Sequence, residues 1–591
     1  MSFLPTAPST NVPVIAPSDI VVTSTIKPWV RPIEWLDLNK PEGVPEKIIG
    51  LVAIYPGELN AAYNYVSFIL GTTVNGSTYT IDWGDGNIET AVEDQDQLHI
   101  YNYDDLPAST EYNGYRQARF EVTLNEGEFF GGTNKINFDR SSPVSNAGNT
   151  TFFGSAILDL FISTSACNDI NTGTSYPLMD CEQVDIRNTA NNRLINIPYE
   201  LFGFKRSLKS IVGVPYLTEG SKNHSQTFNY CGSLEFIPDE FANPDKNWFD
   251  ENTTTTTICF GNCASLKYIP PGLFGDFPNC TDFYRMFYGC SSLQLIPYIG
   301  MSSTLTNVRV REMFQYMPSL RALPKGFNIT KAGSNQYYGI YGFAAVCGVI
   351  TDFSSLNLEE PEGLIDMGTA FNVSSTQTFC QLVEFPFIGQ FTKANLLFAT
   401  FAAQTSLRRF SSQYTYLDFT NCTHLGQTFS NCSSLEELPP IHVTNLTNVN
   451  ALAYTFAGCL RLKEINFVGM LAGPSDGEYF RFAQNCNNLR RISGVNFSYT
   501  NDSGDLDTAF SQCRNLLYID FPGGPTDETG FKHSVILSYT RLNREAIVNI
   551  FNHLCTITHS ATIDLRNNGH TVNLTAADKA IATDKGWTIT L

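Results

Sequence analysis

The sequence predicts a protein of β and α/β structure built from four consecutive parts. Three observations lead to this class: prolines crowd the first 45 residues, short apolar runs separated by turn residues follow, and an apolar motif recurs through the middle of the chain. The expected parts are an extended arm (1–47), a β-sandwich (48–150), a solenoid of stacked repeats (151–530) and an α/β unit that closes it (531–591).

Composition limits the kinds of partner that we expect. Charged residues make up 16% of the 591 residues and the net charge is −20. A protein that binds nucleic acid generally needs clustered Lys and Arg, so we expect no nucleic-acid partner. No apolar stretch approaches the ~20 residues of a membrane span, so we expect no membrane insertion. The N-terminus lacks a basic segment followed by an apolar core, so we expect no signal peptide and synthesis in a cytoplasm.

The first part of the chain predicts an extended arm rather than a packed element. It carries eight prolines before residue 46, which favours a polyproline-like conformation. A tail without fixed structure and an arm that orders by docking on a larger assembly both remain open. Trp29 and Trp35 are costly to leave in water, so we expect at least their part of the arm to pack on something.

The next segment predicts a β-sandwich, because runs such as KIIGLVAIY and YVSFILGTTV are separated by Gly, Asn and Asp turns. The turn Asp82-Trp83-Gly84-Asp85-Gly86, followed by His99 and Tyr101, resembles the signature of polycystic-kidney-disease (PKD) type Ig-like domains. That resemblance implies a structural or adhesive spacer. A calcium site at Asp82 and Asp85 is an open but disfavoured alternative, since one short loop offers few oxygens.

A ten-residue frame, Phe-x-x-Cys-x-x-Leu-x-x-Ile/Leu, recurs along the middle of the chain, often at intervals of 27 residues. Its apolar residues, three apart, cannot all face inward on one strand. We expect a short helical turn in the Phe–Cys half, a short strand after the Leu, and coils stacked so that equivalent residues form ladders. The predicted ladder residues are Cys231, Cys263, Cys290, Met317, Cys432, Cys459, Cys486 and Cys513.

The cysteines of this frame are expected to be structural. Met317 and Gln404 occupy the same position without a thiol, and the total of 15 cysteines is odd. Buried free cysteine behaves as a small hydrophobe that packs well against aromatic rings. Disulfides between neighbouring coils stay open as an alternative, and a metal is disfavoured because no Cys-x-x-Cys pair occurs. We expect no metal and no cofactor.

The frame resembles the repeats of the BspA-like family of leucine-rich-repeat proteins, over roughly Leu178 to Phe521. The resemblance implies a curved α/β solenoid that mediates binding, often adhesion at a cell surface. The chain departs from the family pattern, because we find neither an export signal nor a wall anchor.

The last part predicts two capped helices and two strands. NREAIVNIFNHL forms an amphipathic helix capped by Asn543, and ATIDLRNN forms a strand. A second helix begins at its cap Thr575 and precedes a strand that carries Trp587. This unit would close the open end of the solenoid. Its KGWTI segment resembles the C-terminal caps of leucine-rich-repeat proteins encoded by tailed bacteriophages.

We expect no enzyme, because phosphate-binding loops, the H-E-x-x-H zinc motif and the G-x-S-x-G elbow are all missing from the sequence. Glycan hydrolysis by paired carboxylates stays open, since their separation is a three-dimensional property.

Our hypothesis is a phage virion surface protein, in a tail fibre, a baseplate or an adhesin, that binds the host without catalysis. The arm and the β domain would attach it to other virion proteins, with a homo-oligomer expected by analogy. The solenoid would bind a host cell-surface glycan or protein, and the candidate binding surface is Tyr337, Tyr338 and Tyr341. The alternatives are a capsid or tail decoration protein with a purely structural role and a bacterial cell-surface adhesin.

Overall fold

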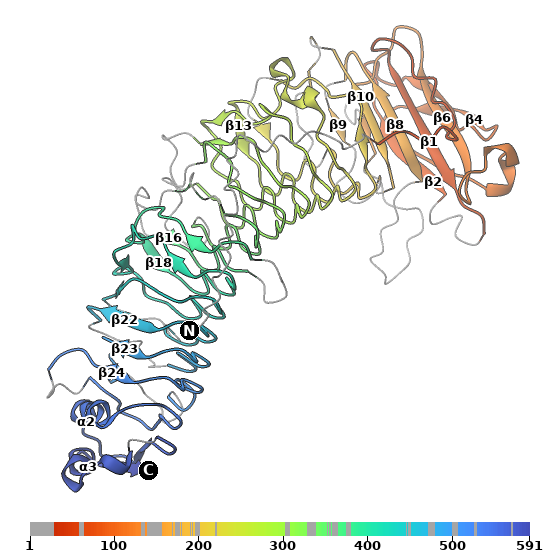
Figure 1. Cartoon of the computed structure of the whole chain (residues 1–591). Coiled ribbons are helices and arrows are strands. Elements are labelled where there is room, and N and C mark those ends of the chain that lie inside the picture. Colours follow the sequence, from red (N-terminus) through yellow and green to blue (C-terminus); the bar gives the residue numbers. More distant parts are fainter. Residues whose placement is uncertain are drawn as a thin grey trace, which may run out of the picture.

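The chain is mostly β-structure with few helices, and from about residue 159 it winds into a solenoid of about 14 turns. Figure 1 shows a curved stack of coils between packed sheets at one end and two helices at the other. This computed structural model describes residues 29–57, 64–131, 136–138 and 156–591. The last range has gaps at 168, 172–177, 179, 190, 192, 195–200, 219–221, 302–307, 328–338, 352, 354–355, 357–364, 374–379, 445, 447–450, 471–478, 499–505, 525–528 and 569–570.

The N-terminal end consists of two sheets. One has seven strands in the order β11-β10-β8-β1-β6-β3-β4, and the other has four in the order β5-β2-β7-β9. They pack through aromatic side chains such as Phe68 and Phe120, whose rings lie 6.1 Å apart. The strands are β1 Lys47–Ile54, β2 Tyr65–Leu70, β3 Thr78–Asp82, β4 Ile88–Val92, β5 Asp96–Ile100, β6 Arg116–Leu124, β7 Ile136–Asn137, β8 Ile157–Ser163, β9 Ile170–Asn171, β10 Gln183–Arg187 and β11 Ser210–Ile211.

The larger sheet continues into the solenoid without interruption. Strand β8 pairs antiparallel with β1 on one side and parallel with β10 on the other. The sequence predicts a domain boundary at residue 150, but β8 and β9 lie beyond it and belong to the two N-terminal sheets. The run ILDLFIS of β8 is buried on both faces, which a strand shared between two parts of one sheet requires.

The arm explains why β1 is apolar throughout. Ile48 and Val52 face the core between the sheets, whereas Ile49 and Leu51 lie on the opposite face, against Trp35 of the arm. Strand β1 is therefore buried on both faces. The side chain of Trp35 also donates from Nε1 to the hydroxyl of Tyr115 at 2.9 Å.

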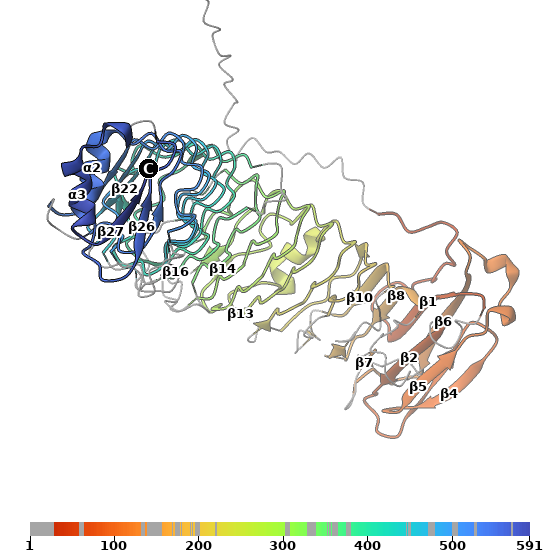
Figure 2. The ribbon, with the colours of Figure 1, turned by 90° about the horizontal axis from the view of Figure 1, so that it is seen from below.

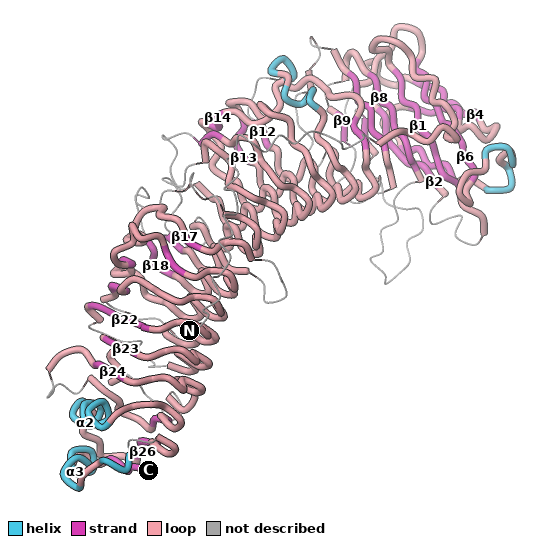
Figure 3. The backbone as a smooth tube through the Cα atoms, in the orientation of Figure 1, coloured by secondary structure: helices cyan, strands magenta, loops and turns pink. Residues whose placement is uncertain are grey.

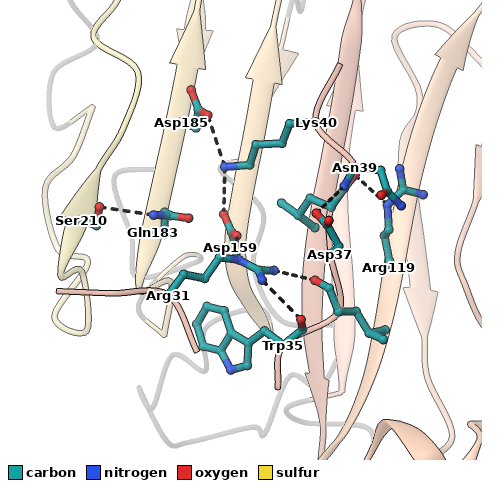
Figure 4. Close-up of polar contacts among 12 residues, drawn as sticks. Arg31, Trp35, Asp37, Asn39, Lys40, Arg119, Asp159, Gln183, Asp185 and Ser210 are labelled. Atoms are coloured by element: carbon teal, nitrogen blue, oxygen red, sulfur yellow. Dashed lines mark hydrogen bonds and ion pairs between the residues drawn. The ribbon is translucent and has the colours of Figure 1, made fainter. Parts of the chain in front are cut away.

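Two charged arm residues cross to the first strands of the solenoid. Arg31 pairs with Asp159 of β8 at 2.7 Å, and Lys40 pairs with Asp185 of β10 at 3.2 Å (Figure 4). Both carboxylates are fully buried, and Arg187 satisfies Asp185 from the other side at 2.8 Å. The arm therefore fastens the sandwich to the solenoid.

Each coil contains a turn-rich stretch, and most coils also contain short strands (Figure 3). Some coils hold more than one, since β16 and β17 of one coil pair separately with β18 and β19 of the next. Strands of neighbouring coils pair in parallel. The strands are β12 Lys222–Asn223, β13 Thr253–Thr255, β14 Asp276–Phe277, β15 Gly300–Met301, β16 Ile365–Asp366, β17 Glu384–Phe385, β18 Ala394–Leu396, β19 Arg409–Phe410, β20 Leu417–Asp418, β21 Ile441–His442, β22 Glu464–Val468, β23 Arg491–Ser493 and β24 Tyr518–Asp520.

The predicted helical turn in the Phe–Cys half is wrong. In the described coils this half is a run of turns, so the solenoid is β rather than α/β. Alternate amides donate along the solenoid, for example from Phe260 N to Met286 O at 2.8 Å in the next coil, whereas Cys290 N donates back to Phe287 O at 3.1 Å within its own turn. Because every second N–H group bonds between coils, the continuous series of bonds within one segment that an α-helix needs cannot form. Residues such as Asn262 and Tyr316 take positive φ to allow this.

Short 3-10 helices accompany the N-terminal sheets, one coil and the C-terminal unit. They are η2 Tyr103–Asp105, η3 Ala108–Thr110, η4 Asp239–Ala242, η5 Pro244–Lys246 and η6 Thr571–Asn573.

The C-terminal end contains helices α2 (Arg544–His553) and α3 (Ala576–Thr583) and the parallel strands β25 (Val535–Ile536), β26 (Ala561–Asp564) and β27 (Trp587–Thr590). As predicted, Asn543 caps α2 and Thr575 caps α3. Figure 2 shows this unit at the far end of the solenoid from β1 and β6.

Candidate functional site

The ladder cysteines lie at equivalent places in successive coils, and all fifteen cysteines of the chain are buried and free. Each predicted ladder thiol donates to a backbone carbonyl of the preceding coil. The Sγ–O distances are 2.8 Å for Cys231, 3.0 Å for Cys263, 2.9 Å for Cys290, 3.1 Å for Cys432, 3.1 Å for Cys459, 3.1 Å for Cys486 and 3.1 Å for Cys513. Met317 is fully buried in the same column.

The hydrogen-bonding role of this column went unrecognised in the sequence. Gln404 takes the place of a thiol and donates from Nε2 to the carbonyl of Phe371. Lys205 occupies the same position in an earlier copy of the frame, and its Nζ donates within its own coil, to the carbonyl of Leu201 at 3.1 Å. Both replacements carry N–H donors. A donor side chain at this position of the frame was therefore the sequence signal for its hydrogen-bonding role. Met317 is the exception.

Burial also makes these thiols poor nucleophiles. It raises the pKa of Cys347 and Cys513 to about 12, although backbone hydrogen bonds oppose the shift. A cysteine reacts as its thiolate, and a raised pKa removes that form at neutral pH. The phenyl rings beside the thiols stack from coil to coil, for example Phe228 on Phe260 at 5.0 Å and Phe401 on Phe429 at 5.6 Å. The column therefore fills the core.

The turn that resembles the PKD signature is held by its own side chains. Asp85 pairs with His99 at 2.8 Å, and the His99 ring stacks on Trp83 at 4.7 Å. Asp82 accepts from the amide of Gly84 at 2.9 Å. A Cβ on Gly84 would lie 2.3 Å from a backbone oxygen, so the turn requires glycine there. Burial raises the pKa of Asp85, but hydrogen bonds from Asn87 and His99 outweigh it and lower the pKa overall.

Within the described ranges, no group of three or more His, Cys, Asp and Glu side chains could hold a metal ion. The described part of the chain likewise contains no helix long and apolar enough to cross a membrane.

Of the predicted binding residues, Tyr337 and Tyr338 lie outside the described residues. Tyr341 is described, and it belongs to a larger surface of tyrosines and arginines. Its ring lies 4.6 Å from the guanidinium carbon of Arg311. Arg311 pairs with Glu312 at 2.8 Å, and the same carboxylate pairs with Arg285 of the preceding coil at 2.6 Å. One buried carboxylate therefore positions two arginines.

The surface extends to the preceding coil. Arg285 lies over Tyr288, with its guanidinium carbon 4.7 Å from the ring centre. Arg309 lies 3.8 Å from the ring centre of Tyr284 and pairs with Asp282 at 3.3 Å. These contacts fall within the range of cation–π interactions.

An exposed tyrosine completes this surface. Tyr316 is 44% exposed, and its ring meets Tyr288 edge to face at 5.2 Å. We define the Tyr–Arg surface as Asp282, Tyr284, Arg285, Tyr288, Arg309, Arg311, Glu312, Tyr316 and Tyr341.

The Tyr–Arg surface has the composition of protein binding sites. Tyrosine and arginine are enriched among the residues that carry most of the binding energy. Burial lowers the pKa of Arg285, but the hydrogen bond and charge of Glu312 outweigh it and raise the pKa overall, so the guanidinium stays charged. Side chains already held by ion pairs and ring contacts lose little conformational entropy when a partner binds.

Comparison with known proteins gives little further information. No family model matches the chain, and none of the curated proteins matches it. A leucine-rich cell surface protein from Faecalibacterium prausnitzii A2-165 is 14% identical, over 68% of this chain and 95% of its own, with a TM-score of 0.30. The plant peptide hormone receptor RGFR1, in complex with RGF2, is 13% identical over 70% of this chain and 64% of its own, with a TM-score of 0.14. Both scores are low, and the solenoid is identified from its own hydrogen-bonded coils.

Proposed function

We propose that this chain is a phage virion surface protein that binds the host surface, without catalysis, through the Tyr–Arg surface of its solenoid. The observation that carries the proposal is the shared carboxylate Glu312, which orients Arg285 and Arg311 beside the rings of Tyr288 and Tyr341. Such rings can stack on sugar rings or on partner side chains. The KGWTI segment, which resembles phage-encoded caps, supports the phage origin.

The N-terminal sheets and the arm would serve as the attachment end, with other virion proteins as partners. This role is supported by the ion pairs of Arg31 with Asp159 and of Lys40 with Asp185, because they join the sandwich and the solenoid into one unit. The PKD-like, Ig-like identity of the sandwich belongs to the same proposal.

The test uses the labelled full-length chain and cells of the host of the phage whose genome carries the sequence. We expect saturable binding and competition with infection, and we expect Tyr316→Asn to weaken binding at least tenfold. The control is Tyr539→Asn, because Tyr539 is also exposed and also has positive φ but lies in the C-terminal unit. Asparagine tolerates positive φ, so both variants keep the backbone.

A second candidate is a decoration protein that braces the particle. The uninterrupted sheet from β4 to β11 favours it, because a rigid body suits a structural role. Wild-type chain that neither binds cells nor competes with infection would overturn host recognition in favour of this second role, and mass spectrometry of purified particles would then detect the chain in the virion.

A further inference from the structure

A cavity of about 520 Å³ lies beside the coil that carries η4 and η5. We call it the 242–275 cavity. Its size falls within the range of sites that bind small molecules. Twelve residues line it, among them Ala242, Pro244, Asn247, Asp250, Glu251 and Asn252.

The lining combines carboxylates and amides with apolar side chains, and none of the twelve residues is basic. The Glu251 carboxylate would repel a ligand that carries carboxylate, sulfate or phosphate. It accepts hydrogen bonds from hydroxyl groups, and the side-chain amides of Asn243, Asn247 and Asn252 can both donate and accept. The lining therefore fits an uncharged ligand with many hydroxyls and an apolar face, which is the chemistry of a neutral sugar ring.

Much of this lining is already fixed by hydrogen bonds and ion pairs. Asp250 pairs with the nearly buried Lys222 and accepts from the amide of Asn252 at 3.0 Å. Asn247 donates to the carbonyl of Leu217 in the preceding coil at 3.3 Å. Trp248 donates from Nε1 to the carbonyl of Pro215 in the same coil at 2.9 Å. In contrast, the Glu251 carboxylate is exposed and has no partner among the described residues. A rigid wall with one uncommitted acceptor is suited to a ligand.

The cavity lies next to the Tyr–Arg surface. Strand β13 follows Asn252 directly, and its last residue Thr255 forms a β-bridge with Asp282, which in turn bridges to Arg309. The chain that lines the cavity therefore runs alongside the residues where the Tyr–Arg surface begins. An extended ligand could contact both, with one ring in the cavity and the next units on the tyrosines.

We propose that the 242–275 cavity binds one neutral sugar unit of the host-surface glycan. This inference rests on the proposed function and names the class of ligand that the same face recognises. The sugar hydroxyls bond to Glu251, Asn247 and Asn252, and the apolar face of the ring lies against Ala242 and Pro244, which are the accessible apolar residues of the lining.

The first experiment measures binding of the full chain to neutral oligosaccharides of hexose and N-acetylhexosamine, and to their sialylated or sulfated forms. We expect neutral forms to bind at least tenfold more tightly than acidic ones. No binding of neutral forms, or equal binding of both, would overturn the proposal.

The second experiment uses two variants. Gly275 has no heavy atom within 4 Å of the position that a Cβ would take, so Gly275→Leu fills open space beside the lining without a clash. We expect it to weaken neutral binding at least tenfold, and Glu251→Gln to weaken it severalfold. The matched control Glu464→Gln removes an exposed carboxylate of β22 and should leave binding unchanged, and melting temperatures check that every variant folds.

The outcomes separate the two proposals. If Gly275→Leu binds neutral sugars and cells as the wild type does, whereas Tyr316→Asn loses cell binding, the sugar cavity is wrong and host recognition stands. If the wild type binds neutral sugars in a manner that Gly275→Leu abolishes, yet no variant or wild type binds cells, the cavity stands and host recognition is wrong.

Discussion

Arg31 of the arm donates from Nε to Oδ2 of Asp159 at 2.7 Å, and the Asp159 side chain is fully buried in β8. Burial raises the pKa of Asp159, and the charges of Lys40 and Arg31 oppose that rise without reversing it. A buried carboxylate of this kind depends on its cations, because the interior solvates charge poorly.

Replacing the arm cation should therefore destabilise the protein. We expect Arg31→Ala to lower the free energy of unfolding by about 1–3 kcal/mol, since Asp159 loses a charge-assisted hydrogen bond. Urea denaturation measures the change. The matched control is Arg409→Ala, whose pair with Glu384 is also 2.7 Å long but well exposed and should be worth less than about 1 kcal/mol. Equal losses in the two variants would show that the arm does not clamp the solenoid.

The donor role of the thiol column gives a second prediction. Gln404→Met keeps the side-chain volume but removes the donor to Phe371 and the acceptor for Cys380, whose Sγ lies 2.7 Å from Oε1. Leaving these buried groups unpaired should cost about 1–3 kcal/mol. Met317→Leu, an apolar exchange in the same column, should cost less than about 1.5 kcal/mol. Urea midpoints compare the two, and a Gln404→Met as stable as the wild type would contradict the assigned hydrogen bonds.

The buried thiols should resist alkylation. Burial raises the pKa of Cys280, Cys347, Cys422 and Cys513 to about 12. At pH 8 the native protein should therefore show almost no reaction with Ellman's reagent, whereas all 15 cysteines should react in guanidinium chloride. Rapid labelling of several thiols in the native state would mean that the coils open readily or that the column is misplaced.

His224 makes stability depend on pH. The side chain is fully buried, its ring stacks on Phe249 at 4.2 Å, and neither ring nitrogen has a hydrogen-bond partner among the described residues. Burial, with a smaller contribution from Lys222, lowers its pKa from 6.5 to about 3. Between these two values the unfolded chain binds a proton that the folded chain does not, so stability falls as pH falls from about 6.5 towards 3.

Between pH 6.5 and pH 3 the free energy of unfolding should fall by about 1.4 kcal/mol per pH unit. Between pH 7 and pH 4.5 the wild type should therefore lose about 2–3 kcal/mol more than His224→Phe, which has no proton to gain. Urea denaturation at both pH values gives the difference. His559→Gln, at an exposed position, should follow the wild type. Parallel losses in the wild type and His224→Phe would show that His224 is protonated inside the fold.

The coil repeat could be predicted from sequence because its signal is local. The Phe, Cys and Leu positions recur within ten residues, and each faces the same core in every coil. The caps Asn543 and Thr575 were predictable for the same reason, since a cap and its helix are adjacent in the chain.

The Tyr–Arg surface was found only in part, because its contacts join residues one coil apart. Arg285 and Glu312 are 27 residues apart, as are Asp282 and Arg309. Opposite charges separated by one repeat were thus a readable signal once the repeat was known. The 242–275 cavity had no such signal, because its walls come from an insertion and a turn with no repeated pattern.

The shared strand β8 has a mechanical consequence. Because β8 is hydrogen-bonded to β1 on one side and to β10 on the other, a pull on the solenoid reaches the sandwich through rows of backbone bonds loaded together. Tension from a tethered cell would be spread over a whole sheet, and the anchorage would yield only when many bonds break at once.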